Sequence, residues 1–437
     1  MTEQHKPKEQ FGSLIGFLLV AIGFAVGVGS LWRFPYVCGT NGGAVFILAY
    51  VVIILLVGIP LLTAEISIGF SSKAAPVKAY QTLAPGKKWY CAAYLHILAA
   101  LFIFAYTAPI YAWILRYLFQ TASGALAGMD SVQLGANFDI LAGSSGTVIL
   151  FALINWGVNV LVVRCGLEKG VERLCKILLP MLAVIMAIII YQGLQLPGAG
   201  KGVAFLLDPD FSKFSFNSLL AALGQAFFAI GIGMLASMVF GSYIKNAKEN
   251  ICKCASFICT AIIVAGLGAG FMIFPMVFAF GLEPAAGPGL TFISLPNVFN
   301  QISGGRVIGT LFYLGFYIAA VTSSAGILES IVGALKDRFK ISRGKALLVA
   351  VLLAVSIGIP SILSESFFAN IDILTSNYII VGGAFIIAIF VGWVWGMEKF
   401  LAAANVRNSF VRTWLTVCLK FVCPVAIIVI FIGSFIQ

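Results

Sequence analysis

The stretch GFAVGVGSLWRFPY, residues 23–36, lies within an apolar run that is long enough to cross a bilayer. It contains three glycines, Gly23, Gly27 and Gly29, followed by Arg33. Glycine weakens a helix, and unwound backbone at membrane depth is tolerated only where it lines a cavity enclosed by protein. Free peptide groups there can coordinate a cation and an anionic group. We therefore expect a broken helix at a binding site, with close helix packing as the alternative role of the glycines.

The composition of the chain indicates a membrane protein. Hydrophobic residues make up 61% of the 437 residues and charged residues 10%, and the mean hydropathy is +1.06. One aqueous core cannot bury so much apolar surface, and alternation of the strand type is absent, so we expect an all-α integral membrane protein. About eleven transmembrane helices are predicted, over residues 13–37, 42–69, 90–122, 146–163, 172–194, 215–244, 254–281, 306–335, 343–361, 371–395 and 409–435.

Lysine and arginine are unevenly divided among the predicted loops. Most lie on the same side as the N-terminus, whereas the opposite loops contain only Lys201, Lys213 and Arg306. The positive-inside rule then places the N-terminus in the cytoplasm and, with eleven helices, the C-terminus outside, in a multi-pass protein of the plasma (inner) membrane. The net charge of +11 reflects this topology, so we expect the lipid bilayer as a partner and no nucleic acid. The sequence leaves monomer and dimer open.

Signs of enzymatic chemistry are missing from the sequence. The histidines His5 and His96 are far apart, and Cys252 and Cys254 do not have the spacing of a zinc site. No nucleophile elbow, phosphate-binding loop or dinucleotide fingerprint follows a strand pattern. We therefore expect that the protein is not an enzyme.

A second break is expected in the sixth helix. The stretch GQAFFAIGIGMLASM, residues 224–238, is interrupted by Gly231 and Gly233. A pair of interrupted helices at corresponding positions of two halves is the sequence signature of a transporter built from inverted repeats. The halves share no visible sequence identity, so the repeat is an inference from the paired breaks.

Eight stretches, in order along nearly the whole chain, resemble the neurotransmitter:sodium symporter family: GFAVGVGSLWRFPYVCGTNGGAVFILAY, GIPLLTAEISIG, GLEKGVERLCKILLP, LPGAGKGVAFLLDPDFSKF, GQAFFAIGIGM, GPGLTFISLPNVF, AAVTSSAGILES and IDILTSNY. The resemblance implies the fold of the bacterial leucine transporter, with five plus five inverted helices and a site between helices 1, 3, 6 and 8. It divides the chain into a cytoplasmic segment (1–12), a core (13–395, with repeats at about 13–194 and 215–395) and a peripheral eleventh helix (396–437).

The resemblance implies a sodium site between helices 1 and 8. Its ligands would be three backbone carbonyls and two hydroxyls, a set of hard oxygens that suits a hard cation. The positions that match are Gly23, Val26, Ala319, Thr322 and Ser323. Taken alone, the hydroxyls of VTSS are also compatible with bonds back to their own helix.

The second sodium site of the family is not matched. The family carries side-chain oxygens at the positions that are Ser30, Ala229 and Ala261 here, and two of these three have none. The helix 7 position that bears an acid, or a serine that helps hold chloride, is Ala265. We therefore expect one sodium ion per cycle and no chloride, although Tyr50 and Gln225 match the chloride pattern.

The pocket implied by the resemblance is apolar with polar backbone, which suits a small molecule with an apolar body. Amides at Val28 and Gly29 could hold a carboxylate. An amino acid is the first expectation. An amine, another organic solute, or a non-transporting sensor of the same fold is the alternative, because the missing sodium site is the one that ordinarily touches the substrate carboxylate. The tyrosine that lids the family's site is replaced by Thr107, and whether the neighbouring Tyr106 takes its role stays open. The lining positions are Phe24, Ala25, Gly27, Val28, Gly29, Ile103, Thr107, Phe228, Gly231, Met234, Ser323 and Ile327.

Gates on both sides of the pocket complete the expected mechanism of alternating access. Arg33 and Asp372 match an extracellular ion pair that closes above Phe228. On the cytoplasmic side, Lys8 and Asp337 take the places of an Arg and Asp pair, with lysine lacking the bidentate fork of arginine. Residues expected beside this latch are Phe11, Ser242 and Tyr243.

Overall fold

The computed structural model describes residues 9–27, 29–282 and 289–436, and in these ranges the secondary structure is helical with no strand. The α-helices are α1 (Leu14–Ala25), α2 (Phe34–Thr40), α3 (Ala44–Ile53), α4 (Ile59–Ser72), α5 (Pro76–Leu83), α6 (Ala92–Tyr106), α7 (Ala108–Ser123), α8 (Ser131–Gly143), α9 (Ser145–Arg164), α10 (Arg173–Leu194), α11 (Ala199–Leu207), α12 (Phe216–Ile230), α13 (Ala236–Tyr243), α14 (Ile251–Ala279), α15 (Leu295–Gln301), α16 (Gly305–Phe339), α17 (Arg343–Leu363), α18 (Glu365–Ile373), α19 (Ile380–Ile389), α20 (Met397–Ala403), α21 (Ser409–Val417) and α22 (Cys423–Ile436).

Within the described ranges, nine helical runs are long and apolar enough to cross a membrane, several of them made of α-helices joined by π-helical turns. The pair α1 and Gly29–Thr40, bent by 50°, makes a tenth span, and α12 with α13 lies at the sixth predicted position. Each of the eleven predicted spans therefore has a helical counterpart. The nine runs are Ala44–Ser72, Lys88–Ser123, Ser145–Arg164, Leu167–Leu194, Ile251–Ala279, Gly305–Phe339, Arg343–Leu363, Glu365–Ala403 and Ser409–Gly433.

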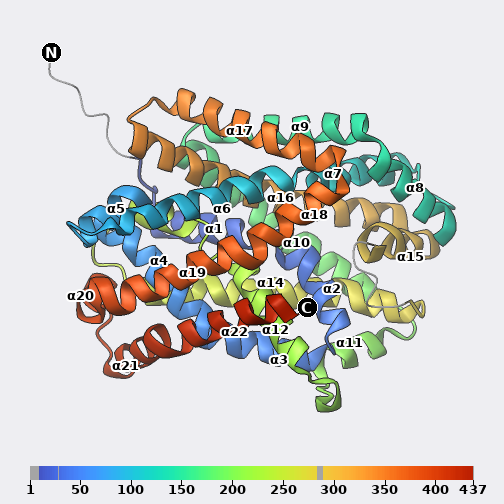
Figure 1. The fold of residues 1–437 in the computed structure, drawn as a ribbon. Coiled ribbons are helices and arrows are strands. Elements are labelled where there is room, and N and C mark those ends of the chain that lie inside the picture. Colours follow the sequence, from blue (N-terminus) through green and yellow to red (C-terminus); the bar gives the residue numbers. More distant parts are fainter. Residues whose placement is uncertain (1–8, 28, 283–288, 437) are drawn as a thin grey trace.

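The helices form one elongated bundle (Figure 1). Helix α5 and the turn between α20 and α21 lie at one end, and α8 and α15 lie at the other. Within its apolar window, α16 is 83% buried, whereas the run Leu167–Leu194 is only 22% buried. Helix α16 therefore lies inside the bundle and can face a central site, while α10 belongs to its outer layer.

Both predicted breaks are present. Helix α1 ends at Ala25, and Val26 has left the helical region with φ −82° and ψ 65°. Between α12 and α13, Gly231 and Gly233 have φ of +71° and +82°, and Leu235 has φ of +73°. Glycine adopts this left-handed region at no steric cost, whereas a leucine there must be held by its surroundings. At the two breaks, backbone N–H and carbonyl groups lie inside the bundle but outside the regular hydrogen-bond pattern of a helix.

Helix α13 packs directly against α4, backbone to backbone. A Cβ atom added at Gly69 would overlap the carbonyl of Met238, and one added at Gly241 would overlap the carbonyl of Ile66. The short helix that follows the second break is therefore seated on the second span through two glycines that admit no side chain.

Candidate functional site

A cavity of about 130 Å³ lies where the two broken helices face α6, α7 and α16. Eleven of the twelve predicted pocket residues line it: Phe24, Ala25, Gly27, Gly29, Ile103, Thr107, Phe228, Gly231, Met234, Ser323 and Ile327. The twelfth, Val28, lies outside the described residues. Backbone freed by the breaks and mostly apolar side chains thus surround one small space, as in a site for a small organic molecule.

Three glycines of the cavity wall are required by close contacts. A Cβ atom at Gly27 would lie 2.5 Å from Ser323 Cβ, and one at Gly29 would lie 2.9 Å from the ring of Phe228. At Gly231, where φ is positive, a Cβ atom would lie 2.5 Å from the ring of Phe24. The glycines therefore act both as helix breakers and as the space into which α16 and the aromatic rings pack.

The cavity also has lining residues that the sequence analysis did not assign to the pocket: Trp32, Tyr36, Tyr106, Ile110, Tyr111, Ala229 and Phe368. Helical periodicity carried a signal for Ile110 and Tyr111, which follow the predicted Thr107 by three and four residues. Aromatic rings therefore dominate the mouth of the cavity more than the sequence analysis predicted.

The predicted sodium ligands lie at the end of α1 and on α16, and these two segments are in contact. A Cβ atom at Gly23 would lie 3.4 Å from Thr322 Cβ, and one at Gly27 would lie 3.7 Å from the carbonyl oxygen of Ala319. Ser323 Oγ donates to the carbonyl of Phe24 at 2.8 Å, which bridges α16 to the end of α1. Thr322 Oγ1 donates at 3.1 Å to the carbonyls of Ile318 and Ala319 in its own helix, the bonding that the sequence analysis gave as the alternative role of this hydroxyl. Buried hydroxyls and carbonyls thus meet at the break of helix 1.

The positions of the second sodium site offer little oxygen. Ser30 Oγ already donates to the carbonyl of Ala25 at 3.3 Å, and Ala229 and Ala261 have no side-chain oxygen. Gln225, which matches the chloride pattern, donates from Nε2 to the carbonyl of Gly29 at 2.8 Å. The side chains of Ser30 and Gln225 near this position therefore already form hydrogen bonds with backbone carbonyls.

Arg33 and Asp372 line the same cavity, but no ion pair joins them among the described residues. Arg33 donates to Gln225 Oε1 at 3.3 Å and lies over the ring of Phe228 at 4.8 Å. Asp372 Oδ1 instead accepts from the hydroxyl of Tyr106 at 2.6 Å. The predicted pairing in the outward-closed state stays a prediction, and Tyr106 is a contact of the acid that the sequence analysis left open.

This geometry predicts the effect of Asp372→Asn. The amide oxygen still accepts from Tyr106, so the open cavity is retained, but the attraction to Arg33 during closure is lost. We expect substrate affinity within about twofold of the parent and transport slower by about tenfold, which corresponds to roughly 1.4 kcal/mol of barrier. Equilibrium binding and uptake in proteoliposomes measure the two quantities. Equal losses in both would place Asp372 in the binding site or the fold.

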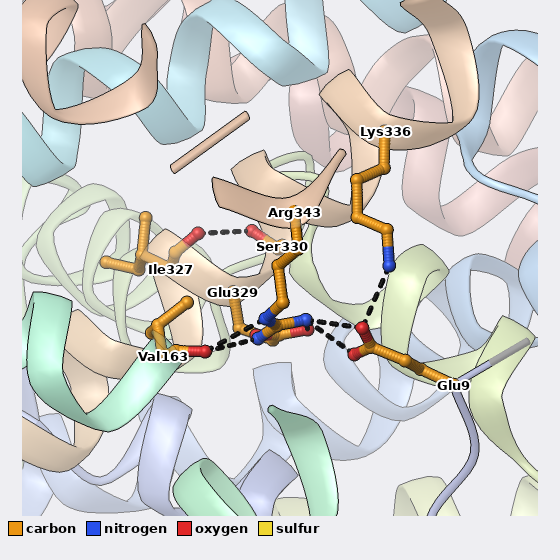
Figure 2. Close-up of polar contacts among 7 residues, drawn as sticks. All are labelled: Glu9, Val163, Ile327, Glu329, Ser330, Lys336 and Arg343. Carbon is orange, nitrogen blue, oxygen red and sulfur yellow. Dashed lines mark hydrogen bonds and ion pairs between the residues drawn. The ribbon is translucent and has the colours of Figure 1, made fainter. Parts of the chain in front are cut away.

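A charge cluster that the sequence analysis missed joins the N-terminal segment to α16 and α17 (Figure 2). Glu9 accepts from Lys336 at 2.8 Å and from Arg343 at 2.6 Å, and Arg343 also pairs with the fully buried Glu329. Arg343 Nε donates to the carbonyl of Val163 at 3.0 Å. One guanidinium thus connects the N-terminal segment with α16 and the end of α9. Arginine can bond several acceptors at once because its planar fork has more N–H donors than the ammonium group of lysine.

Glu9 gives this cluster a dependence on pH. Burial alone would raise the pKa of Glu9, but the hydrogen bond from Lys336 and the charges of Arg343 and Lys336 outweigh it and hold that pKa below its ordinary value. A depressed carboxyl pKa contributes stability above the pKa of the unfolded chain, and this is lost as the pH falls through the depressed value. The ion pairs of Glu9 therefore contribute their full stability at neutral pH.

The predicted latch residues lie next to this cluster. Phe11 is 2% exposed, its N–H donates to the carbonyl of Tyr243 at 3.1 Å, and its ring packs edge-on against Tyr243. Asp337 accepts from the N–H of Ala75 at 2.9 Å and lies 3.4 Å from Lys340 Nζ. Lys8 lies outside the described residues. The N-terminal segment is thus anchored to the end of α13 through the buried Phe11.

Glu65 of α4 accepts from the N–H of Gly233 at 3.2 Å. The resemblance to the family implies this contact, which joins α4 to the break between α12 and α13. A small cavity between two interrupted membrane helices, lined by Arg33 and Asp372, is typical of a membrane carrier for a small molecule.

Comparison with known proteins identifies the class more closely. The model of the sodium:neurotransmitter symporter family matches residues 8–133 and 129–437. The chain is 36% identical to the sodium-dependent transporter YhdH of Bacillus subtilis, over 99% of this chain and 98% of that protein. It is 28% identical to the sodium-dependent serotonin transporter of Drosophila melanogaster, over 98% of this chain and 76% of that protein.

A solved structure agrees with the family match. The crystal structure of MhsT in complex with L-phenylalanine superposes with a TM-score of 0.91 at 35% sequence identity, over 98% of this chain and 100% of that chain. The protein therefore belongs to the sodium:neurotransmitter symporter family and has the leucine-transporter-type fold. It is a sodium-coupled symporter of the membrane, not an enzyme.

Proposed function

We propose that this symporter imports an amino acid together with one sodium ion and without chloride. The observation that carries the proposal is the meeting of Thr322, Ser323 and the Ala319 carbonyl with the broken end of α1, directly beside the cavity. A sodium ion bound there would hold the break of helix 1 in the geometry that lines the substrate site. This couples occupation by the ion to substrate affinity.

The cavity supports an amino acid with an apolar side chain. Ile103, Met234 and Ile327 provide an apolar wall, and the amide of Gly29, the first residue of the helical segment Gly29–Arg33, suits a carboxylate. The similar protein MhsT has been crystallised with L-phenylalanine. We infer import across the plasma (inner) membrane, with the N-terminus in the cytoplasm and the C-terminus outside.

One observation favours the alternative, a solute without the amino-acid backbone. Thr107 Oγ1 donates to the carbonyl of Ile103 at 2.5 Å, so the residue that replaces the family's lid tyrosine already uses its hydroxyl. The neighbouring Tyr106 is bonded to Asp372. An amine or another organic solute would not need this missing donor, and a sensor of the same fold would bind it without transport.

The number of sodium ions is the sharpest test of the proposal. A cation that loses about two of five or six oxygen ligands is left with an uncompensated desolvation cost of several kcal/mol. We therefore expect the position beside Ala229 and Ala261 to bind no sodium. L-Phenylalanine binding to the purified protein should depend on sodium with a Hill coefficient near one, and a zwitterion should carry about one charge per cycle in proteoliposomes, as predicted from one bound ion.

A matched variant makes this test decisive. Ala229→Thr together with Ala261→Asn would restore two oxygens, and should raise the Hill coefficient toward two if these positions fail only for want of ligands. A coefficient close to two in the parent protein would contradict the proposed stoichiometry. A screen of amino acids and amines by thermal shift, with and without sodium, separates the amino-acid proposal from its alternative.

A further inference from the structure

The unwound residues between α12 and α13 need hydrogen-bond partners, because no water is available to them inside a bilayer. Gly233 has both of its backbone groups bonded by side chains from other helices. Its N–H donates to Glu65 Oε2 at 3.2 Å, and its carbonyl oxygen lies 2.9 Å from Nδ1 of His96 on α6. A carbonyl can only accept, so the proton of the His96 ring lies on Nδ1.

The other ring nitrogen of His96 is also occupied. Tyr80, on α5, has its hydroxyl oxygen 2.9 Å from His96 Nε2. In a neutral ring with the proton on Nδ1, Nε2 accepts and the Tyr80 hydroxyl donates. The two rings are nearly parallel, with centroids 6.0 Å apart, and Tyr80 packs edge-on against Phe390 at 4.6 Å. Tyr80 and His96 are fully buried, so no solvent competes for these bonds.

The carbonyl of Gly233 is placed where no side chain of its own would fit. Its φ is +82°, and a Cβ atom there would lie 2.7 Å from the carbonyl oxygen of Ile380 on α19. A Cβ atom on Gly383 would lie 3.1 Å from both His96 Nδ1 and the Gly233 oxygen. Two glycines therefore clear the space in which the histidine reaches the broken helix.

This contact lies immediately beside the substrate cavity. Met234, the residue after Gly233, lines the cavity, as does Gly231, whereas neither His96 nor Tyr80 is part of its lining. The peptide plane of Gly233 sets the direction in which the chain leaves for Met234. Leu235, with φ of +73°, holds a strained conformation that its surroundings must maintain.

We propose that His96 is a positioning residue for substrate binding: oriented by Tyr80, it holds the Gly233 carbonyl and thereby the Met234 wall of the cavity. The inference rests on the proposed function, because it takes this cavity as the substrate site. Substrate affinity then depends on Tyr80, a residue of α5 that does not touch the cavity. Helix α5 lies at the end of the bundle that the positive-inside rule assigns to the cytoplasm (Figure 1).

The experiment compares variants of the full-length protein in detergent with saturating sodium, using L-phenylalanine as the probe. His96→Leu removes both bonds, His96→Asn retains an N–H donor near the position of Nδ1, and Tyr80→Phe keeps both rings but removes one bond. Tyr94→Phe is the matched control, because this tyrosine is also near the cytoplasmic end of α6 but bonds Arg338 instead. Hydrogen–deuterium exchange of a peptide covering residues 229–238 is measured on the same samples.

We expect His96→Leu to weaken L-phenylalanine binding by about tenfold and to raise deuterium uptake in 229–238, the effect of freeing one buried carbonyl. His96→Asn should recover most of both losses, Tyr80→Phe should weaken binding by about threefold, and Tyr94→Phe should change neither. The proposal would be overturned if His96→Leu and His96→Asn changed affinity and deuterium uptake equally. The N–H donor that asparagine retains would then have no effect, as expected if His96 only fills space.

The test separates this proposal from the proposed function. If the parent protein binds no L-phenylalanine, the substrate proposal fails, and deuterium uptake in 229–238 alone decides the role of His96. If His96→Leu does not fold, Tyr80→Phe decides it, because the phenyl ring fills the same space. Unchanged affinity and unchanged uptake in Tyr80→Phe would then contradict the orientation of His96 by Tyr80.

Discussion

Ser323→Ala and Thr322→Val are each expected to abolish the sodium dependence of substrate binding while leaving the fold intact. These two side chains supply the hydroxyl ligands of the proposed sodium site, and both are buried at the break of helix 1. A site of about five oxygens that loses one should no longer hold sodium over the range of the titration, since the remaining oxygens cannot compensate the loss of hydration. Sodium-induced thermal stabilisation, titrated in a potassium background, measures the change.

Ser324→Ala is the matched control for these variants. Ser324 is the next residue of α16 and is also buried, but its hydroxyl faces α9, where it donates to Asn159 Oδ1 at 2.9 Å. Its replacement should cost only the one hydrogen bond, about 1 kcal/mol, and leave the sodium titration unchanged. Sodium stabilisation that survives intact in Ser323→Ala, or that disappears in Ser324→Ala, would contradict the site.

Arg343→Ala is expected to have the largest effect on stability. Glu329 is fully buried, and Arg343 is its partner among the described residues, with Glu9 on the other side of the guanidinium (Figure 2). Removal of one partner of a buried ion pair leaves an uncompensated charge and costs about 3–5 kcal/mol. The variant should express poorly and unfold at a much lower temperature, as followed by thermal unfolding of the purified protein.

A second substitution should reverse this loss. Glu329→Gln in the Arg343→Ala background removes the stranded charge, so the double variant should be more stable than Arg343→Ala alone. Arg338→Ala, an exposed arginine that bonds the Tyr94 hydroxyl, should be nearly neutral. If Arg343→Ala unfolds at the temperature of the parent, Glu329 is not held as a charged partner and the cluster does not act as a clamp.

The fold was predictable because its signals are local. Hydropathy located the spans, and Gly27 and Gly233 marked the broken helices, because both effects act over a few residues. Span ends were less certain. The run Glu365–Ala403 continues beyond residue 395, where the tenth span was predicted to end, because the π-helical turn Phe390–Gly396 joins α19 to α20. An apolar scale does not detect such a turn.

The polar partners were less predictable, because they are far apart in the chain. Glu9 and Arg343 are 334 positions apart, and Tyr106 and Asp372 are 266 apart. The sequence gives the sign of each charge, but several partners of opposite sign are available to each, and burial decides among them. The gate roles of Asp372 and Asp337 stay predictions, and the contacts of these acids with Tyr106 and the N–H of Ala75 emerged only from the packing.

The contact between α4 and α13 has a mechanical consequence. Side chains at a helix interface act as compliant spacers, and rotamer changes let the helices slide; at Gly69 and Gly241 there are none, so peptide groups bear directly on one another. We infer that the second and sixth spans move as one stiff body where α4 and α13 meet. We then expect bending during the transport cycle to concentrate at residues 231–235. Within this segment, Glu65 bonds the N–H of Gly233 and His96 bonds its carbonyl.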